Sequence, residues 1–189
     1  MKINLSYGAF DAIMKATKPF VSKDDVRPVF TQILLESDNG KVTATALDGV
    51  KAIKLTVAAE TETETGSMLI PWVKPIGKRG VYALITDDEK SITIETVTEQ
   101  RTFRKVQGSY MNTDRFFENK EPPETTMYFD PKQLADALTA FDDKVKIEYF
   151  GTNKGVIITD LAYEQKAFVL PTSPPKRDKR NVNNAPNEI

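Results

Sequence analysis

The side chains of this chain that could take part in chemistry are carboxylates, lysines and tyrosines, because its 189 residues include no cysteine and no histidine. That excludes thiolate nucleophiles, disulfides, Cys/His zinc sites and histidine-based catalytic triads. The densest carboxylates are Asp24-Asp25, Asp87-Asp88-Glu89 and Asp142-Asp143. Each cluster falls at a predicted turn or helix end, where acidic residues commonly act as caps, and adjacent carboxylates tend to point apart.

Phosphate-binding motifs are also missing, since the sequence contains neither a Walker-type loop nor a Rossmann glycine fingerprint. Without a nucleophile and a base to pair, we predict that the chain is not an enzyme, has no catalytic residues, and needs no metal or cofactor. An enzyme that holds a metal ion through one of the acidic clusters is the less favoured alternative.

The overall composition is that of a folded protein with balanced charge. Hydrophobic residues make up 40% of the chain, and 26 basic side chains face 27 acidic ones. No apolar run approaches the roughly 20 residues that span a bilayer, and the N-terminus does not resemble a signal peptide. We therefore expect a cytoplasmic protein without a membrane partner. The near-neutral total permits basic residues gathered on one surface.

The elements that position these residues form a unit of strand, helix and further strands that recurs three times, beginning near Lys2, Ser67 and Thr125. In the first unit a strand over residues 2–5 leads to Ser6, a helix N-cap residue. Apolar residues at helical spacing predict a helix that ends near Thr17, because Pro19 disfavours helical geometry before it. Three strands follow, over residues 31–36, 41–47 and 51–58.

The second and third units repeat this order with different loops. The second has a strand over 67–70, a short helix within 71–79, and strands over 81–86, 91–96 and 101–106. The third has a strand over 125–129 and a helix that starts at Asp130-Pro131. Its helix has an apolar face from Leu134 to Phe141, and its later strands cover residues 145–150, 156–159 and 166–170.

Such units predict an α+β fold in which repeated βαβββ units form antiparallel sheets with helices on one face. Units 1–60 and 67–118 would close one pseudo-symmetric domain over residues 1–118. Residues 124–173 would form a third unit, a half-domain, and residues 174–189, rich in Pro, Asn, Lys and Arg, a disordered tail. The third unit lacks a mate, and its exposed sheet edge and half core favour contact with another subunit.

Specific residues add a family resemblance. Phe20 to Glu36, Asn39 to Val42 and Ala44 to Gly49 resemble the start of the middle domain of the bacterial DNA polymerase III beta subunit, the sliding clamp. Val145 to Phe150 and Lys166 to Pro171 are similar to the end of that family's chain. The resemblance covers most of residues 1–173. Family members have six half-domain units per chain, whereas this chain resembles the middle domain plus one half-domain.

The resemblance implies a processivity factor that encircles double-stranded DNA without regard to sequence. Rings of this family contain twelve half-units, so a homo-oligomeric ring of three-unit chains would need four chains. In such a ring the helices line the central hole, where weak positive charge is enough for sliding. The DNA-contacting residues expected there are Lys15, Lys18, Lys74, Lys78, Arg79 and Lys132.

The family also binds DNA polymerase and clamp-loader proteins through short apolar peptides. Carried over to this sequence, one side of the peptide pocket is Leu47, Gly49, Val50, Lys51 and Ala52. The second side is Phe168, Val169, Leu170, Pro171, Thr172 and Ser173, and a third segment contributes Arg115 and Phe116. Met111 replaces the family's proline near that segment. The same residues could instead belong to an ordinary core, since apolar type alone does not indicate exposure.

A second functional hypothesis fits the odd number of units. A shortened clamp-like adaptor or decoy, encoded by a phage or mobile element, would bind clamp-binding peptides without encircling DNA. The oligomeric state and the effect on polymerase processivity would separate the two hypotheses.

Overall fold

The computed structural model describes residues 1–24, 26–75, 82–97, 99–117, 126–151, 155–161 and 165–173. The chain divides into two compact units, residues 1–119 and 120–189, and each is described by itself. Within the described residues no helix is long and apolar enough to cross a membrane.

The first unit begins with a strand and a capped helix. In β1 (Lys2–Ser6) the side chains of Ile3 and Leu5 are buried, and Ser6 caps α1 (Tyr7–Thr17) by accepting a hydrogen bond from the Ala9 amide at 3.2 Å. Helix α1 gives way to a 3-10 turn, η1 (Lys18–Phe20), because Pro19 cannot continue the α-helical hydrogen bonds. A second 3-10 turn, η2, covers Pro28–Thr31.

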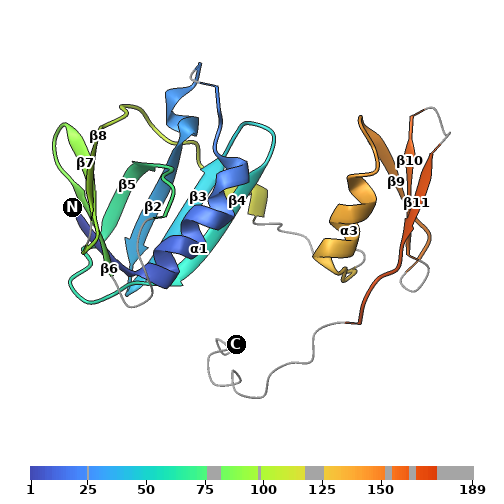
Figure 1. The fold of residues 1–189 in the computed structure, drawn as a ribbon, viewed down its shortest axis with the longest axis horizontal. Helices are drawn as coiled ribbons and strands as arrows, with labels where there is room; N and C mark the ends of the chain where they lie inside the picture. The colour runs from blue at the N-terminus through green and yellow to red at the C-terminus, as the bar shows by residue number, and fades with distance from the viewer. Residues whose placement is uncertain are drawn as a thin grey trace. The chain divides into compact units, whose positions relative to one another are not determined.

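Two four-stranded antiparallel sheets follow (Figure 1). The first has the order β4-β3-β2-β5 and the second the order β1-β6-β7-β8. Their remaining bounds are β2 (Gln32–Asp38), β3 (Lys41–Leu47), β4 (Ala52–Ala58), β5 (Gly66–Pro71), β6 (Tyr82–Asp87), β7 (Ser91–Glu95) and β8 (Gln100–Arg104).

The two halves of this unit exchange their first strands. β1 pairs not with its own hairpin strands but with β6 of the second half, in a register that sets Ile3 opposite Ile85. β5 in turn pairs with β2 of the first half and sets Met68 opposite Leu35. Each half therefore completes the sheet of the other. One buried core joins both sheets and the inner face of α1, with Phe10, Ile13 and Met14 almost fully enclosed.

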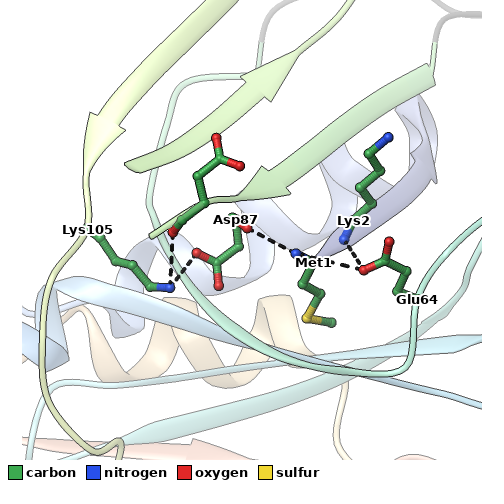
Figure 2. A network of polar contacts seen from close by, with 6 residues as sticks. Met1, Lys2, Glu64, Asp87 and Lys105 are labelled. Carbon is green, nitrogen blue, oxygen red and sulfur yellow. Dashed lines mark hydrogen bonds and ion pairs between the residues drawn. The ribbon is translucent and has the colours of Figure 1, made fainter. Parts of the chain in front are cut away.

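Polar contacts hold the start of β1 between two distant segments (Figure 2). The Met1 ammonium donates a hydrogen bond to the Asp87 carbonyl oxygen at 3.0 Å and lies 3.8 Å from the Glu64 carboxylate. The same carboxylate accepts from the Lys2 amide at 3.0 Å, and Lys105 forms an ion pair with Asp87. These contacts reinforce the exchanged position of β1.

The second unit contains one helix and one three-stranded antiparallel sheet in the order β11-β10-β9. Asp130 caps α3 (Pro131–Leu138) through the amides of Lys132 and Gln133. The strands are β9 (Val145–Tyr149), β10 (Val156–Asp160) and β11 (Lys166–Val169). Among the residues that the structure describes in this unit, the buried hydrophobic core consists of Val156, Ile158 and Val169, and no side chain of α3 is buried.

The predicted fold class, α+β with antiparallel sheets, is confirmed. Among the described residues, the complete order of strand, helix and three further strands is seen in the first half, as β1, α1, β2, β3 and β4. Two local predictions were wrong where the structure describes them. Residues 72–75 do not continue as a helix, and the rest of the predicted second helix lies outside the described residues. Residues 126–129 form no strand, because a strand needs a hydrogen-bonded neighbour and no described strand pairs with them. The predicted tail, residues 174–189, also lies outside the described residues.

Candidate functional site

A tight turn between β3 and β4 carries the first candidate side of a peptide pocket. The Asp48 carboxylate accepts hydrogen bonds from the amides of Val50 and Lys51, both at 3.0 Å. Those amides lower the pKa of Asp48 below its usual range. Gly49 has φ of 97°, a backbone conformation that favours glycine. The turn pushes the Val50 side chain into solvent, where it is 96% exposed.

A second segment is fastened beside this turn by Tyr110. The Tyr110 hydroxyl accepts from the Leu47 amide at 3.2 Å and lies within hydrogen-bond distance of the carbonyl oxygens of Gln32 and Thr45. Its ring meets Phe30 edge-on, with centroids 6.3 Å apart. Burial raises the pKa of Tyr110 to about 12, so the phenol remains protonated at neutral pH.

Beyond Tyr110 the chain enters the short helix α2 (Asp114–Phe117). The Asn112 side chain accepts a hydrogen bond from the Asp114 amide at 2.8 Å, and the Asp114 carboxylate forms an ion pair with Lys54 of β4. These contacts hold α2 against the outer strand of the sheet. The Phe117 side chain is 45% exposed.

The turn, the start of β4 and this segment enclose a pocket of about 300 Å³. Its lining residues are Leu47, Gly49, Val50, Lys51, Ala52, Met111 and Phe117. The five residues predicted for the first side of the peptide site thus lie together around one hollow. The size and largely apolar lining suit a leucine or aromatic side chain of a peptide.

A wider and more open hollow adjoins the pocket through Val50 and Lys51. It also involves η1 and the loop after it, including Pro19 and Val21. Lys51 lies over the Phe20 ring at 5.6 Å, so its stem covers apolar surface while its ammonium stays accessible. Val50 therefore stands between two hollows on one face of the first unit.

Met111 and Phe117 are lining residues that the sequence reasoning did not select. The sequence marks Met111 only as a replacement for the family's proline, and Phe117 directly follows the predicted Phe116. Arg115 and Phe116 belong to α2, but their side chains lie outside what the structure describes. No local sequence signal selects Met111 or Phe117, because Tyr110 positions this segment through hydrogen bonds to residues far away in the sequence.

The residues predicted for the other side of the peptide site belong to the second unit. Phe168 and Leu170 are 56% and 57% exposed, whereas Val169 is buried in the core between them. The Phe168 ring lies close over Gly155, where a Cβ atom would come within 2.9 Å of it. Pro171 is half-buried, and Thr172 and Ser173 are exposed. This segment therefore presents two large apolar side chains to solvent.

The predicted DNA-contacting residues are exposed wherever the structure describes them. Lys15 pairs with Asp11 at 2.6 Å, which raises its pKa, while Lys18 lies over the Trp72 ring at 5.3 Å. The Trp72 indole donates to the Met14 carbonyl oxygen at 2.7 Å, so the segment that carries Lys74 lies against the last turn of α1. Lys132 is exposed on the first turn of α3, and Lys78 and Arg79 lie outside the described residues.

Comparison with solved structures identifies proteins whose architecture is similar to this one. The DNA polymerase sliding clamp from Bacillus subtilis superposes with a TM-score of 0.73 over 90% of this chain and 49% of its own, at 14% sequence identity. The DNA polymerase III beta chain from Streptococcus pneumoniae TIGR4 gives a TM-score of 0.70 over 92% and 50%, also at 14% identity. The Helicobacter pylori beta clamp bound to a DNA ligase peptide gives 0.54 over 84% and 48%, at 15% identity.

The resemblance read from the sequence is thus confirmed at the level of the fold, and this chain spans about half the length of those clamps. No family model matches the sequence, and no curated protein matches it.

Proposed function

We propose that this chain, which has the fold of bacterial sliding clamps, assembles with copies of itself into a ring around duplex DNA and tethers partner proteins there. The observation that carries the proposal is the similarity to sliding clamps across about nine-tenths of the chain. A ring holds DNA by topology, so its inner wall needs only weak contacts with phosphates. Partners held beside the DNA rebind quickly because their effective concentration is high.

We propose the pocket between the Asp48 turn and α2 as a peptide site of the first unit. In the second unit, we propose the exposed apolar residues Phe168 and Leu170 as contacts for a partner peptide. Support for a peptide ligand comes from the pocket's apolar lining and from the H. pylori clamp, whose structure contains a DNA ligase peptide. Val50 and Phe117 would contact leucine or aromatic anchors, since such anchors dominate binding energy in small apolar pockets. The partners we propose are polymerase and clamp-loader proteins that carry such peptides.

The proposed DNA-contacting surface comprises the exposed lysines of α1, of its C-terminal turn and of the adjoining segment. Lys15, Lys18 and Lys74 are all exposed. Trp72 contacts Lys18 and the last turn of α1, so Lys18 and the segment that carries Lys74 lie at the same end of the helix. Lys132 would add charge from α3. Their contacts with phosphates would be sequence-independent and salt-sensitive.

A topological assay tests the proposal. The protein is diluted until its subunits separate, mixed with a nicked circular duplex, and concentrated so that rings can close around the DNA without a loader. After gel filtration in raised salt, the circle is cut at one site. Encirclement predicts that the protein co-elutes with the circle and is released after cutting. Absence from the circle, or equal retention on cut DNA, would contradict it, and peptide binding without retention would support the adaptor hypothesis.

A further inference from the structure

The second unit has a core face that is only half covered. Ile147 and Tyr149 of β9 lie on the same sheet face as the buried Ile158 and Val156, which they oppose across the ladder. They are nevertheless 54% and 42% exposed. Helix α3 packs towards β11, so it leaves this part of the face open. Large apolar side chains exposed on a core face indicate a missing neighbour.

In the first unit, the equivalent sheet positions are covered by a neighbouring strand. The counterparts of Ile147 at the same inward position are Leu35 in β2 and Ile85 in β6, and both are 0% exposed. Each is covered because the first strand of the opposite half pairs with the free edge of its own strand. β9 occupies the same place in the third half. Among the described residues it pairs only with β10, so its other edge is open.

The second unit also carries the element that would fill such an edge. Residues 126–130 precede α3 as β1 precedes α1, with Met127 and Phe129 turned towards the core like Ile3 and Leu5. The Tyr128 carbonyl oxygen accepts from the Thr172 amide at 2.7 Å, just as the Asn4 carbonyl oxygen accepts from the Glu60 amide at 2.9 Å. Segment 126–130 therefore has a hydrogen-bonded neighbour on one side, as β1 does. On the other side, where β1 pairs with β6, no strand that the structure describes pairs with it.

We propose that the third half-domains of two chains exchange residues 126–130, so that each pairs with β9 of the other chain. A second copy is the fitting partner because the donor segment and the acceptor edge lie in the same unit, which makes the surface self-complementary about a two-fold axis. The register follows from the first unit, where Ile3 lies opposite Ile85 and Leu5 opposite Ala83. By the same alignment, Met127 lies opposite Ile147 of the second copy and Phe129 opposite Val145.

The register also predicts a pair that can be cross-linked. Asn4 directs its backbone groups to Glu60 and Thr63, so it lies opposite Leu84 without mutual hydrogen bonds. Its counterpart Tyr128 would face Lys146 of the second copy in the same way. Such pairs have Cα atoms about 4.5 Å apart, within the range that a disulfide can bridge. The chain contains no cysteine, so introduced ones have no competitors.

The test mixes full-length Tyr128→Cys with a tagged Lys146→Cys variant under mild oxidation and detects products on non-reducing gels. Exchange predicts a tagged heterodimer in the mixture and no efficient cross-link from either variant alone. As a control, Lys166→Cys on β11, at the opposite edge of the sheet, replaces Lys146→Cys and should give no cross-link. In the double variant, exchange predicts covalent dimers. A monomer with an internal disulfide, or no cross-link in the mixture, would overturn the proposal.

A second measurement does not rely on cysteines. Mass photometry of Ile147→Asp should show a dimer dissociation constant raised by about 100-fold or more, because the two-fold axis places the buried charge at the interface twice. The matched control Leu161→Asp, at a residue that is 63% exposed and outside the predicted pairing, should leave the constant unchanged. Equal effects of the two substitutions would contradict the exchange. This inference concerns only how chains join, and it stands or falls independently of DNA or peptide binding.

Discussion

Replacing Val50 with alanine offers a direct test of the peptide site. Val50 lines the pocket yet is 96% exposed in the free protein, so the folded state loses little packing when its methyl groups are removed. We expect the free energy of unfolding to change by no more than about 0.5 kcal/mol, as is usual for surface substitutions. Leu47 would be a poor choice, because it is 3% exposed and its truncation would cost roughly 2–5 kcal/mol of stability.

The loss in binding follows from the area that a peptide would cover. Valine has two more carbon groups than alanine, and each is worth about 0.8 kcal/mol when buried. If a bound peptide encloses the Val50 side chain, Val50→Ala should weaken binding by about 1.6 kcal/mol, or roughly 15-fold in Kd. Fluorescence anisotropy with the DNA ligase peptide bound by the H. pylori clamp would measure Kd, and urea unfolding would confirm stability.

The matched control is Val97→Ala. Val97 also belongs to the first unit and is 81% exposed, but it lies between β7 and β8 and does not line the pocket. Its truncation should leave Kd within about twofold of the original value. An unchanged Kd for Val50→Ala, or an equal loss for Val97→Ala, would refute the assignment of the pocket.

Three further predictions concern the supports of this site and the basic surface. Tyr110→Phe leaves the buried Leu47 amide without its acceptor and should lower the free energy of unfolding by about 1–2 kcal/mol in urea titrations. Because folding raises the pKa of Tyr110 from 10.0 to about 12, its contribution is complete below pH 10.0 and is lost as the pH rises through about 12. The stability difference between the original protein and Tyr110→Phe should therefore shrink over that range, and a constant difference would contradict this account. For Asp48, whose pKa is lowered from 3.8 by hydrogen bonds from Lys51 and Val50, the carboxylate's contribution is present above pH 3.8 and lost as the pH falls through the lower folded value. Asp48→Asn should remove that part of the acid sensitivity, and unchanged acid unfolding would count against it. Finally, replacing Lys15, Lys18 and Lys74 together with alanine should reduce the slope of the logarithm of the DNA-binding constant against the logarithm of salt concentration by about two to three. The control replaces Lys41, Lys90 and Lys166 with alanine. An equal reduction of the slope in this control would argue against the proposed surface.

Local patterns were enough to predict most elements of the fold. Ser6 as cap, apolar residues at helical spacing and Pro19 define the ends of α1 within a residue. Asp38-Asn39-Gly40 marks the hairpin between β2 and β3, where Asn39 and Gly40 both adopt positive φ. Such signals depend on neighbours in the sequence, so they can be recognised without knowledge of the tertiary structure.

The candidate site was predictable only in part. The first side of the site was identified by its resemblance to sliding clamps, and its residues Leu47, Gly49, Val50, Lys51 and Ala52 line one pocket. The contributions of Met111 and Phe117 were missed, because Tyr110 positions that segment through hydrogen bonds to residues far away in the sequence. The helix predicted before Arg79 had the weakest pattern, since Pro75 and Gly77 both interrupt it.

By itself, the sequence determined the α+β class with its strands and helices, and the exclusion of cysteine and histidine chemistry. Only the tertiary structure decided which strands pair. β1 pairs with β6 and β5 pairs with β2, so each lies in the sheet of the opposite half, where Ile3 and Met68 are buried. Residues 126–130 have the same apolar pattern, but no described strand pairs with them. Strand formation depends on a hydrogen-bonded neighbour, so no local pattern could reveal that this segment would be left unpaired.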